Sequence, residues 1–178
     1  MTQAALAKVY QYFGIPTWGF GGCTDALNLD EQAAMEFGMM SMWAPLCGIN
    51  LAHDVGYLGS GMIGDLRAIV LNDEINAYVR HLLCRGVSVD RDHVAIDAIE
   101  RVGPGGNFLS DQHTIEHFRT ELWRPVLSNR DNIASWKDRG AKTMKAKLNE
   151  KVHDILEKHE PKGLNPDITR ELEKFGDS

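Results

Sequence analysis

One histidine-rich block of the sequence has the residue types and the spacing of a metal site. His113 and His117 lie four residues apart, so on a helix both imidazoles share one face and could bind zinc, with Glu116 as a base. This H-x-x-E-H pattern leaves two of its five positions free, and a third ligand must come from elsewhere, from His153, His159 or an acid. The block also continues into an amphipathic run. A surface or interface helix is therefore the favoured interpretation, no metal ligand is assigned, and a zinc hydrolase is the least favoured function.

A glycine-rich segment, Gly-Pro-Gly-Gly at residues 103–106, is the second chemical candidate. Backbone N–H groups of such segments can hold phosphate, but the spacing GxxxxGK[ST] is absent here. A helix end followed by a tight turn explains the same residues. A nucleotide site is therefore disfavoured.

Two short apolar runs are typical of buried strands that end in glycine loops. Residues 15–20 lead into Gly21 and Gly22, and residues 49–54 are followed by further glycines. Between them, Asp30 can cap a helix that Pro45 ends or kinks. The alternation of strand, glycine loop and helix predicts an α/β fold with parallel strands.

The rest of the chain is predicted to be mainly helical, after an opening helix that ends near Gly14. Asn72 or Asp73 can cap one helix and Asp90 another, and a brief extended stretch is expected before residue 109. Further helices are expected over residues 113–122, over most of 136–159, and after Asn165-Pro166.

Ligands of α/β folds bind at the carboxyl ends of the parallel strands. This rule directs attention to three loops, at residues 18–25, 53–57 and 103–108. We expect the three to converge on one cavity. Two or three strands are too few to close a barrel, so the sheet is either unusually small or part of a larger one.

Composition excludes several classes of protein. The chain has 178 residues with a formal charge of −6, which does not favour nonspecific nucleic-acid binding. It has no apolar run near the ~20 residues that cross a bilayer, and no secretory leader pattern. Cys23, Cys47 and Cys84 are widely spaced, as expected of reduced thiols in a cytoplasmic protein.

Several blocks of the sequence resemble the trimethylamine methyltransferase family over roughly residues 4–175. They are GGCTDA at 21–26, DEQAA at 30–34, GIN at 48–50, HDVGY at 53–57, LNDEI at 71–75, VGPGGNFLSD at 102–111 and HTIEHFRTELWRP at 113–125. Members of this family are large (β/α)8 barrels that move a methyl group from a methylated amine to the cobalt of a corrinoid protein.

The resemblance implies that this chain is the carboxyl-terminal third or so of such an enzyme. The expected fold is α/β, a partial (β/α)8 TIM-type barrel containing the last strands, with a C-terminal helical extension. Residues 1–128 would belong to the barrel and residues 129–178 to the helical tail. No pyrrolysine is present in the sequence as given, which argues against trimethylamine unless the missing part, or an in-frame amber codon read as a stop, hides that residue. Related family members lack pyrrolysine and act on quaternary amines such as glycine betaine. The chain would bind no cofactor itself, because a partner protein carries the corrinoid.

A quaternary ammonium has no N–H, so aromatic faces are expected to hold it. The aromatic candidates near the strand ends are Trp18, Phe20, Tyr57 and Phe108, with burial in the core as the alternative for each.

Three polar residues complete the candidate site. Asp25, His53 and Asp54 could neutralise the cation, move a proton or orient a carboxylate, with capping or loop hydrogen bonds as the alternative. The glycines Gly21, Gly22, Gly105 and Gly106 would form loops beside the pocket. No enzyme nucleophile is needed, because cobalt attacks the methyl group.

The alternative to an enzyme is a noncatalytic piece that self-associates or pairs with a separate upstream half. Unpaired strand edges favour such association. We expect the chain to be a homo-oligomer or to pair with a missing N-terminal portion, and to be inactive alone.

Overall fold

The first part of the chain forms a β-α-β unit. The computed structural model describes residues 2–86 and 88–176, beginning with helix α1 (Thr2–Tyr12), strand β1 (Trp18–Phe20), helix α2 (Glu31–Leu46) and strand β2 (Leu51–His53). The Asp30 carboxylate accepts the backbone N–H groups of Gln32 and Ala33, so this residue caps α2 as predicted. The helix ends one residue after Pro45.

Strands β1 and β2 are parallel, as the sequence pattern predicts. Trp18 pairs with Leu51, Gly19 with Ala52 and Phe20 with His53. A second, antiparallel pair joins β3 (Tyr57–Leu58) to β4 (Ile63–Gly64). Each sheet has two strands within the described residues.

Helix α3 (Leu66–Arg80) begins earlier than expected. Its N-cap is Asp65, whose carboxylate accepts the Arg67 backbone N–H at 2.8 Å. Asn72 caps nothing: it lies fully buried within the helix, where its amide donates to the Ala68 carbonyl at 2.9 Å. The predicted helix cap at Asn72 or Asp73 is therefore wrong. Asn72 is a polar residue in the buried middle of a helix, and its residue type suggested the start of one.

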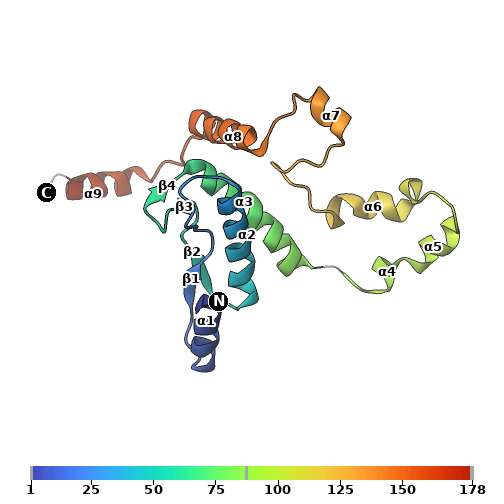
Figure 1. The fold of residues 1–178 in the computed structure, drawn as a ribbon, viewed down its shortest axis with the longest axis horizontal. Coiled ribbons are helices and arrows are strands. Elements are labelled where there is room, and N and C mark those ends of the chain that lie inside the picture. The colour runs from blue at the N-terminus through green and yellow to red at the C-terminus, as the bar shows by residue number, and fades with distance from the viewer. Residues whose placement is uncertain (1, 87, 177–178) are drawn as a thin grey trace.

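The hydrophobic core lies between α2, α3 and a helix from the last third of the chain, α8 (Met144–Lys158) (Figure 1). Its members are Ala26, Ala33, Phe37, Leu58, Ala68, Leu71, Leu127 and Leu148. Leu127 and Leu148 thus pack with residues of the first half. The core spans the predicted division at residue 128 between barrel and helical tail, and that division stays a prediction.

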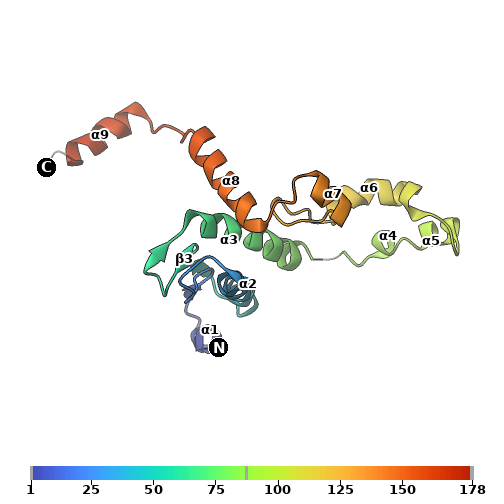
Figure 2. The ribbon, with the colours of Figure 1, turned by 45° about the horizontal axis from the view of Figure 1, so that its top comes forward.

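Between α3 and α8 the chain makes a long excursion, which both ribbon views show (Figures 1 and 2). It contains a π-helical turn (His81–Arg85), α4 (Arg91–Val94), α5 (Ile96–Val102), a 3-10 turn (Phe108–Ser110), α6 (Gln112–Glu121) and α7 (Ile133–Asp138). We call residues 88–121 the arm. The helix expected after Asp90 is broken at Ala95, which adopts a left-handed conformation with φ of 53°.

One other expectation fails in this half. The extended stretch expected before residue 109 contains a 3-10 turn instead, capped by the Asn107 side chain. Residues 136–159 are mostly helical, as predicted, in two helices, α7 and α8, which are separated by Gly140 and Ala141 with positive φ. The terminal helix α9 (Pro166–Gly176) begins at the predicted Asn165-Pro166 signal.

The chain is therefore mainly helical, with two small sheets among the described residues. The β1-α2-β2 unit has the connectivity of a barrel repeat. A partial barrel stays a prediction. No helix in the described ranges is both long and apolar enough to span a membrane.

Candidate functional site

The loops that follow β1 and β2 are joined to each other by backbone hydrogen bonds. The Gly21 N–H donates to the His53 carbonyl at 2.8 Å, and the Gly56 N–H donates to the Gly22 carbonyl at 3.1 Å. One step further on, the Thr24 N–H donates to the Tyr57 carbonyl at 3.1 Å. Parallel pairing at the strands thus continues into the loops, and it brings residues 20–25 against residues 53–61.

Close packing explains the two adjacent glycines in the first loop. A Cβ on Gly21 would lie 2.8 Å from Cβ of Ala52, and one on Gly22 would collide with the Asn72 side chain. The Ser41 hydroxyl fixes the same turn, because it donates to the Gly21 carbonyl at 2.7 Å. The absence of side chains at these two glycines lets the loop approach β2 and α3.

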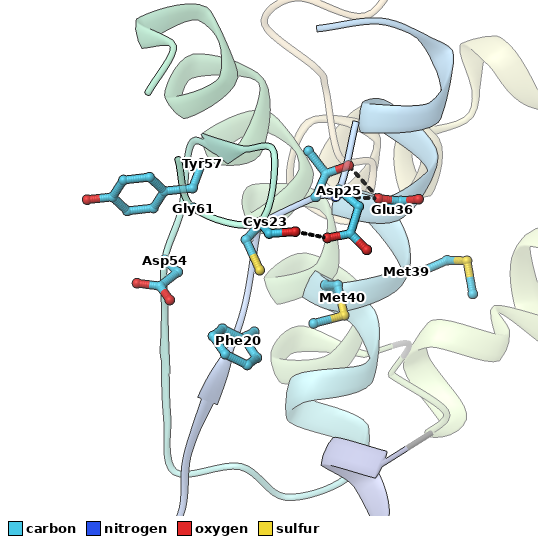
Figure 3. A pocket seen from close by; sticks show the side chains of 11 residues that line it. Phe20, Cys23, Asp25, Glu36, Met39, Met40, Asp54, Tyr57 and Gly61 are labelled. Carbon is cyan, nitrogen blue, oxygen red and sulfur yellow. Dashed lines mark hydrogen bonds between the residues drawn. The ribbon is translucent and has the colours of Figure 1, made fainter. Parts of the chain in front are cut away.

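The two joined loops and α2 enclose a cavity of about 470 Å³. Its lining residues are Phe20, Cys23, Thr24, Asp25, Glu36, Met39, Met40, Asp54, Tyr57, Ser60 and Gly61. Figure 3 shows Asp25, Glu36 and the two methionines on one side, with Asp54 and Tyr57 across from them.

The cavity has acidic walls. Asp25, Glu36 and Asp54 contribute three carboxylates, and the lining residues in the described part of the chain include no lysine, arginine or histidine. Opposite charge is attracted to such a site, and the attraction is stronger where protein replaces water. The arrangement therefore favours a cationic ligand.

Glu36 is held in its charged form by its neighbours. Its carboxylate accepts hydrogen bonds from the Thr24 hydroxyl, from the Gln32 amide at 3.0 Å and from the Asp25 backbone N–H at 3.1 Å. The Thr24 bond, followed by the Gln32 bond, lowers the pKa of Glu36 below its ordinary value. The wall formed by α2 is therefore negatively charged at neutral pH.

Two residues of the second loop adopt left-handed backbone conformations beside the cavity. They are Asp54, with φ of 59°, and Ser60, with φ of 56°. The Ser60 hydroxyl donates to Oδ1 of Asp25 at 2.6 Å. Oδ1 of Asp54 lies 2.8 Å from Nδ1 of His53. Each aspartate thus has one oxygen oriented by a polar partner.

Cys23 lies between the two acidic walls. Burial, and then the negative charge of Asp54, raise the pKa of its thiol above the ordinary value. The thiol is therefore protonated at neutral pH. Cys23, Cys47 and Cys84 all have free thiols in the structure.

Four of the predicted site residues line this cavity: Phe20, Asp25, Asp54 and Tyr57. Trp18 and His53 line a neighbouring hollow between α1 and β1, to which Phe20 also belongs. The His53 ring contacts both aromatic rings there, with centroids 5.0 Å from Trp18 and 5.3 Å from Phe20. The structure therefore divides the predicted aromatic group between two adjacent hollows.

The expected convergence of a third loop is wrong. Gly105, Gly106 and Phe108 belong to the arm, which extends away from the cavity (Figures 1 and 2). None of the three is among the residues that line the cavity, and Phe108 begins the 3-10 turn that precedes α6. A helix end followed by a tight turn, the alternative explanation, fits better, since Gly103 ends α5 with φ of 68°.

Sequence reasoning missed the part of the wall that α2 contributes. Glu36, Met39 and Met40 all line the cavity. The sequence gives no distinct signal for Glu36, because an acid beside the core residues Ala33 and Phe37 is also the ordinary pattern of an amphipathic helix.

Comparison with known proteins identifies the family. The trimethylamine methyltransferase (MTTB) family matches residues 1–177. A glycine betaine methyltransferase of Desulfitobacterium hafniense Y51 is 33% identical over 97% of this chain and 36% of its own length. The trimethylamine methyltransferase MttB of D. hafniense DCB-2 is 33% identical over 97% of this chain and 34% of its own length. The trimethylamine methyltransferase MttB of Methanosarcina barkeri Fusaro is 29% identical over 99% of this chain and 35% of its own length.

The chain therefore spans about a third of the length of these curated relatives. The matched residues include the two joined loops, the three acids and the helix that carries Glu36. The family match covers nearly all of the sequence, and the chain belongs to the trimethylamine methyltransferase family.

Proposed function

We propose that this chain provides the cation-binding wall of an amine methyltransferase that removes a methyl group from a methylated or quaternary amine. The observation that carries the proposal is the cavity with three carboxylates, two aromatic rings and no basic side chain among its described lining residues. Membership of a methyltransferase family supports it.

The ligand chemistry follows from the walls. A quaternary ammonium cannot donate a hydrogen bond through nitrogen, so a site must hold it by charge and by aromatic faces. Phe20 and Tyr57 offer such faces, and Asp25, Glu36 and Asp54 offer the charge. The volume of about 470 Å³ lies within the range of small-molecule sites, which begins at roughly 300 Å³.

Methyl transfer from such an amine needs a nucleophile aligned with the carbon–nitrogen bond. The resemblance implies that this acceptor is the cobalt of a corrinoid carried by a partner protein, and we adopt that assignment as part of the proposal. Residues of this chain would position the amine and exclude water. The protonated Cys23 thiol is a poor nucleophile, so it would not compete for the methyl group.

Part of the site must come from elsewhere in a complete enzyme. Phe20 and Tyr57 are 46% and 42% exposed, so one side of the cavity faces solvent. The relatives are about three times as long as this chain. We therefore expect weak amine binding by this chain and no methyl transfer by it alone.

The test compares a cation with its neutral isostere. Isothermal titration of the chain with choline and with 3,3-dimethyl-1-butanol separates charge recognition from apolar burial. We expect choline to bind more tightly, and Asp25→Asn to weaken choline binding about fivefold, since one charge at close range contributes about 1 kcal/mol in high dielectric. The asparagine oxygen can still accept the Ser60 hydrogen bond.

The matched control is Asp167→Asn, which removes an exposed acid on α9. It should leave choline binding unchanged. Equal affinities for choline and its neutral isostere, or no detectable choline binding, would contradict the proposal.

A second candidate function is association through the small parallel sheet. Trp18 and Leu51 are register partners, yet they are 69% and 56% exposed, although parallel sheets are normally covered on both faces. An isolated two-stranded sheet is also marginally stable. These observations favour pairing with a further strand, from a second copy or from an upstream portion.

Light scattering after size exclusion tests this candidate on the chain itself. A mass that rises with concentration, and that returns to the monomer value in Leu51→Lys, supports self-association. If the chain is monomeric and unfolds cooperatively at every protein concentration tested, the hypothesis that it must associate through the sheet is contradicted.

A further inference from the structure

The arm brings together ligand groups that are distant in the sequence. His93 on α4, with His117 and Glu121 on α6, each offer a ligand atom, and these atoms all lie within 4.8 Å of one another. All three residues are half-buried. We call them the arm triad.

The geometry of α6 places two members of the triad on one face. His117 and Glu121 are four residues apart, which on a helix is about one turn. Asp111 caps this helix by accepting the His113 N–H at 3.0 Å, and its carboxylate also pairs with Arg101 of α5 at 2.9 Å. The start of α6 is therefore tied to the preceding helix.

His93 reaches the same face because α4 is tied to α6. Nε2 of His113 lies 3.1 Å from the Asp92 carbonyl, the residue before His93. The rings of His113 and His117 are tilted against each other with centroids 4.4 Å apart, and those of His93 and His117 lie 5.5 Å apart. The His113 side chain of α6 thus links this helix to α4.

Two members of the triad, His93 and Glu121, each have a charged partner that orients the side chain. Nδ1 of His93 lies 2.7 Å from the Asp90 carboxylate, which leaves Nε2 for a metal. A carboxylate on the far nitrogen is the usual support of a metal-binding histidine. Oε1 of Glu121 accepts from Arg85 at 2.9 Å, which leaves its second oxygen.

We propose that His93, His117 and Glu121 bind a divalent transition metal, with zinc the best match. Two imidazoles and one carboxylate form a known catalytic zinc donor set, which keeps a fourth position for water or another ligand. Ligand atoms of tetrahedral zinc lie roughly 3.3 Å apart, as bond lengths of 2.0–2.1 Å require. Metal binding would draw the three ligand atoms from their present spacing, within 4.8 Å of one another, to that distance.

This triad differs from the H-x-x-E-H interpretation of the sequence. The ring of His113 is engaged with the backbone of α4, and Glu116 accepts a hydrogen bond from the Gln112 amide at 2.7 Å. The further ligand was expected at His153, His159 or an acid downstream. Glu121 is such an acid, whereas the second histidine of the triad is His93, which lies before the motif.

The experiment titrates the complete, metal-free chain with zinc and, separately, with cobalt(II). We expect one zinc per chain, and visible absorption of tetrahedral cobalt(II). His93→Ala and Glu121→Gln should each weaken zinc binding about 100-fold or more, and Asp90→Asn by 10- to 100-fold, typical of a lost outer-shell partner. Asparagine remains a good helix cap, so Asp90→Asn preserves α4.

Matched controls separate this site from other histidines. Glu116→Gln and His153→Ala remove groups outside the triad that take no part in placing it. Both should bind zinc within twofold of the unmodified chain. Circular dichroism of each variant identifies any that loses helix.

Two outcomes overturn the proposal. One is the absence of stoichiometric zinc binding. The other is zinc binding that His93→Ala leaves intact. If His113→Gln then abolishes that binding, the metal lies on the H-x-x-E-H histidines instead. Zinc affinity is measured without any amine. The metal-site proposal can therefore be confirmed or refuted independently of the proposed methyltransferase function.

Discussion

The buried carboxylate of Glu74 accepts a hydrogen bond from the backbone N–H of Leu127 at 3.0 Å, across 53 positions of sequence. The same carboxylate accepts the N–H groups of Val126 and Ser128 at 3.1 and 2.9 Å. Leu127 packs in the core, and its carbonyl accepts from Lys147 of α8 at 2.8 Å. Glu74 therefore fixes the point at which the chain returns from its excursion to the core.

Removing this carboxylate should destabilise the fold. Glu74→Ala leaves three backbone N–H groups without their acceptor, and each buried donor left unpaired costs about 1–3 kcal/mol. We expect a loss of roughly 3 kcal/mol or more in the free energy of unfolding. Glu74→Gln keeps one acceptor oxygen and should lose less. Urea denaturation measures both, with Glu150→Gln on the surface as the control. Equal stability of Glu74→Ala and the unmodified chain would show that this contact is dispensable.

Glu74 also predicts a dependence of stability on pH. Burial raises the pKa of Glu74, but the N–H groups of Ser128, Leu127 and Val126 outweigh it, and the folded-state pKa is lowered. The resulting stability is present above the unfolded pKa, near 4.3, and is lost as pH falls through the folded value. Urea midpoints from pH 7 down to 3 should therefore fall more steeply for the unmodified chain than for Glu74→Gln. Parallel curves would contradict the prediction.

Substituting alanine for Gly22 and for Gly38 should change the stability of the fold in opposite directions. A methyl group on Gly22 collides with Asn72 and approaches Cα of Val55 at 3.4 Å, so Gly22→Ala should destabilise the chain by about 1–3 kcal/mol. Gly38 lies within α2, and a Cβ there meets nothing within 4 Å. Gly38→Ala should therefore stabilise the chain by about 0.5–1 kcal/mol. Thermal unfolding measures both, and a shared direction would contradict the packing of the glycine loop.

Local signals in the sequence predicted local structure well. Asp30 before an apolar helical run, and Asn165 before Pro166, both mark helix starts that the structure contains. Strands flanked by glycines were also predicted, because their apolar runs are short and bounded. Asn72 shows the limit: the same residue type caps a helix or hydrogen-bonds within one, and only tertiary burial decides between them.

The candidate site was predictable only where neighbouring strands determine it. Residues 20–25 and 53–57 converge because β1 and β2 pair, and sequence indicates parallel strands. The loop at residues 103–108 carries similar glycines, but no strand carries it to the same edge. His93 was missed for a related reason, since the fold of the arm, and no fixed spacing, brings it to His117.

Cys23 should react slowly with thiol reagents, and Asp54 should be part of the reason. Burial and the Asp54 charge raise the thiol pKa, so little thiolate is present near pH 7.5. Asp54→Asn removes the second cause and should increase the rate of modification at Cys23, because a lower thiol pKa leaves more thiolate to react. Mass spectrometry after timed iodoacetamide treatment resolves Cys23 from the exposed Cys84, the internal control. A slower reaction in Asp54→Asn would contradict this electrostatic coupling.

The aromatic face of Tyr57 should contribute to amine binding through its ring and not through its hydroxyl. The ring lies at the cavity edge opposite the α2 wall (Figure 3), and it is 42% exposed, so a cation over it gains about 0.5–1 kcal/mol. Tyr57→Leu should therefore weaken choline binding by about two- to fivefold, whereas Tyr57→Phe should stay within about twofold of the unmodified chain. Titration calorimetry with 3,3-dimethyl-1-butanol supplies the control, because its affinity should change little in either variant. If Tyr57→Leu weakens the neutral alcohol as much as choline, the ring provides apolar surface only, and the charge must be met by the three carboxylates.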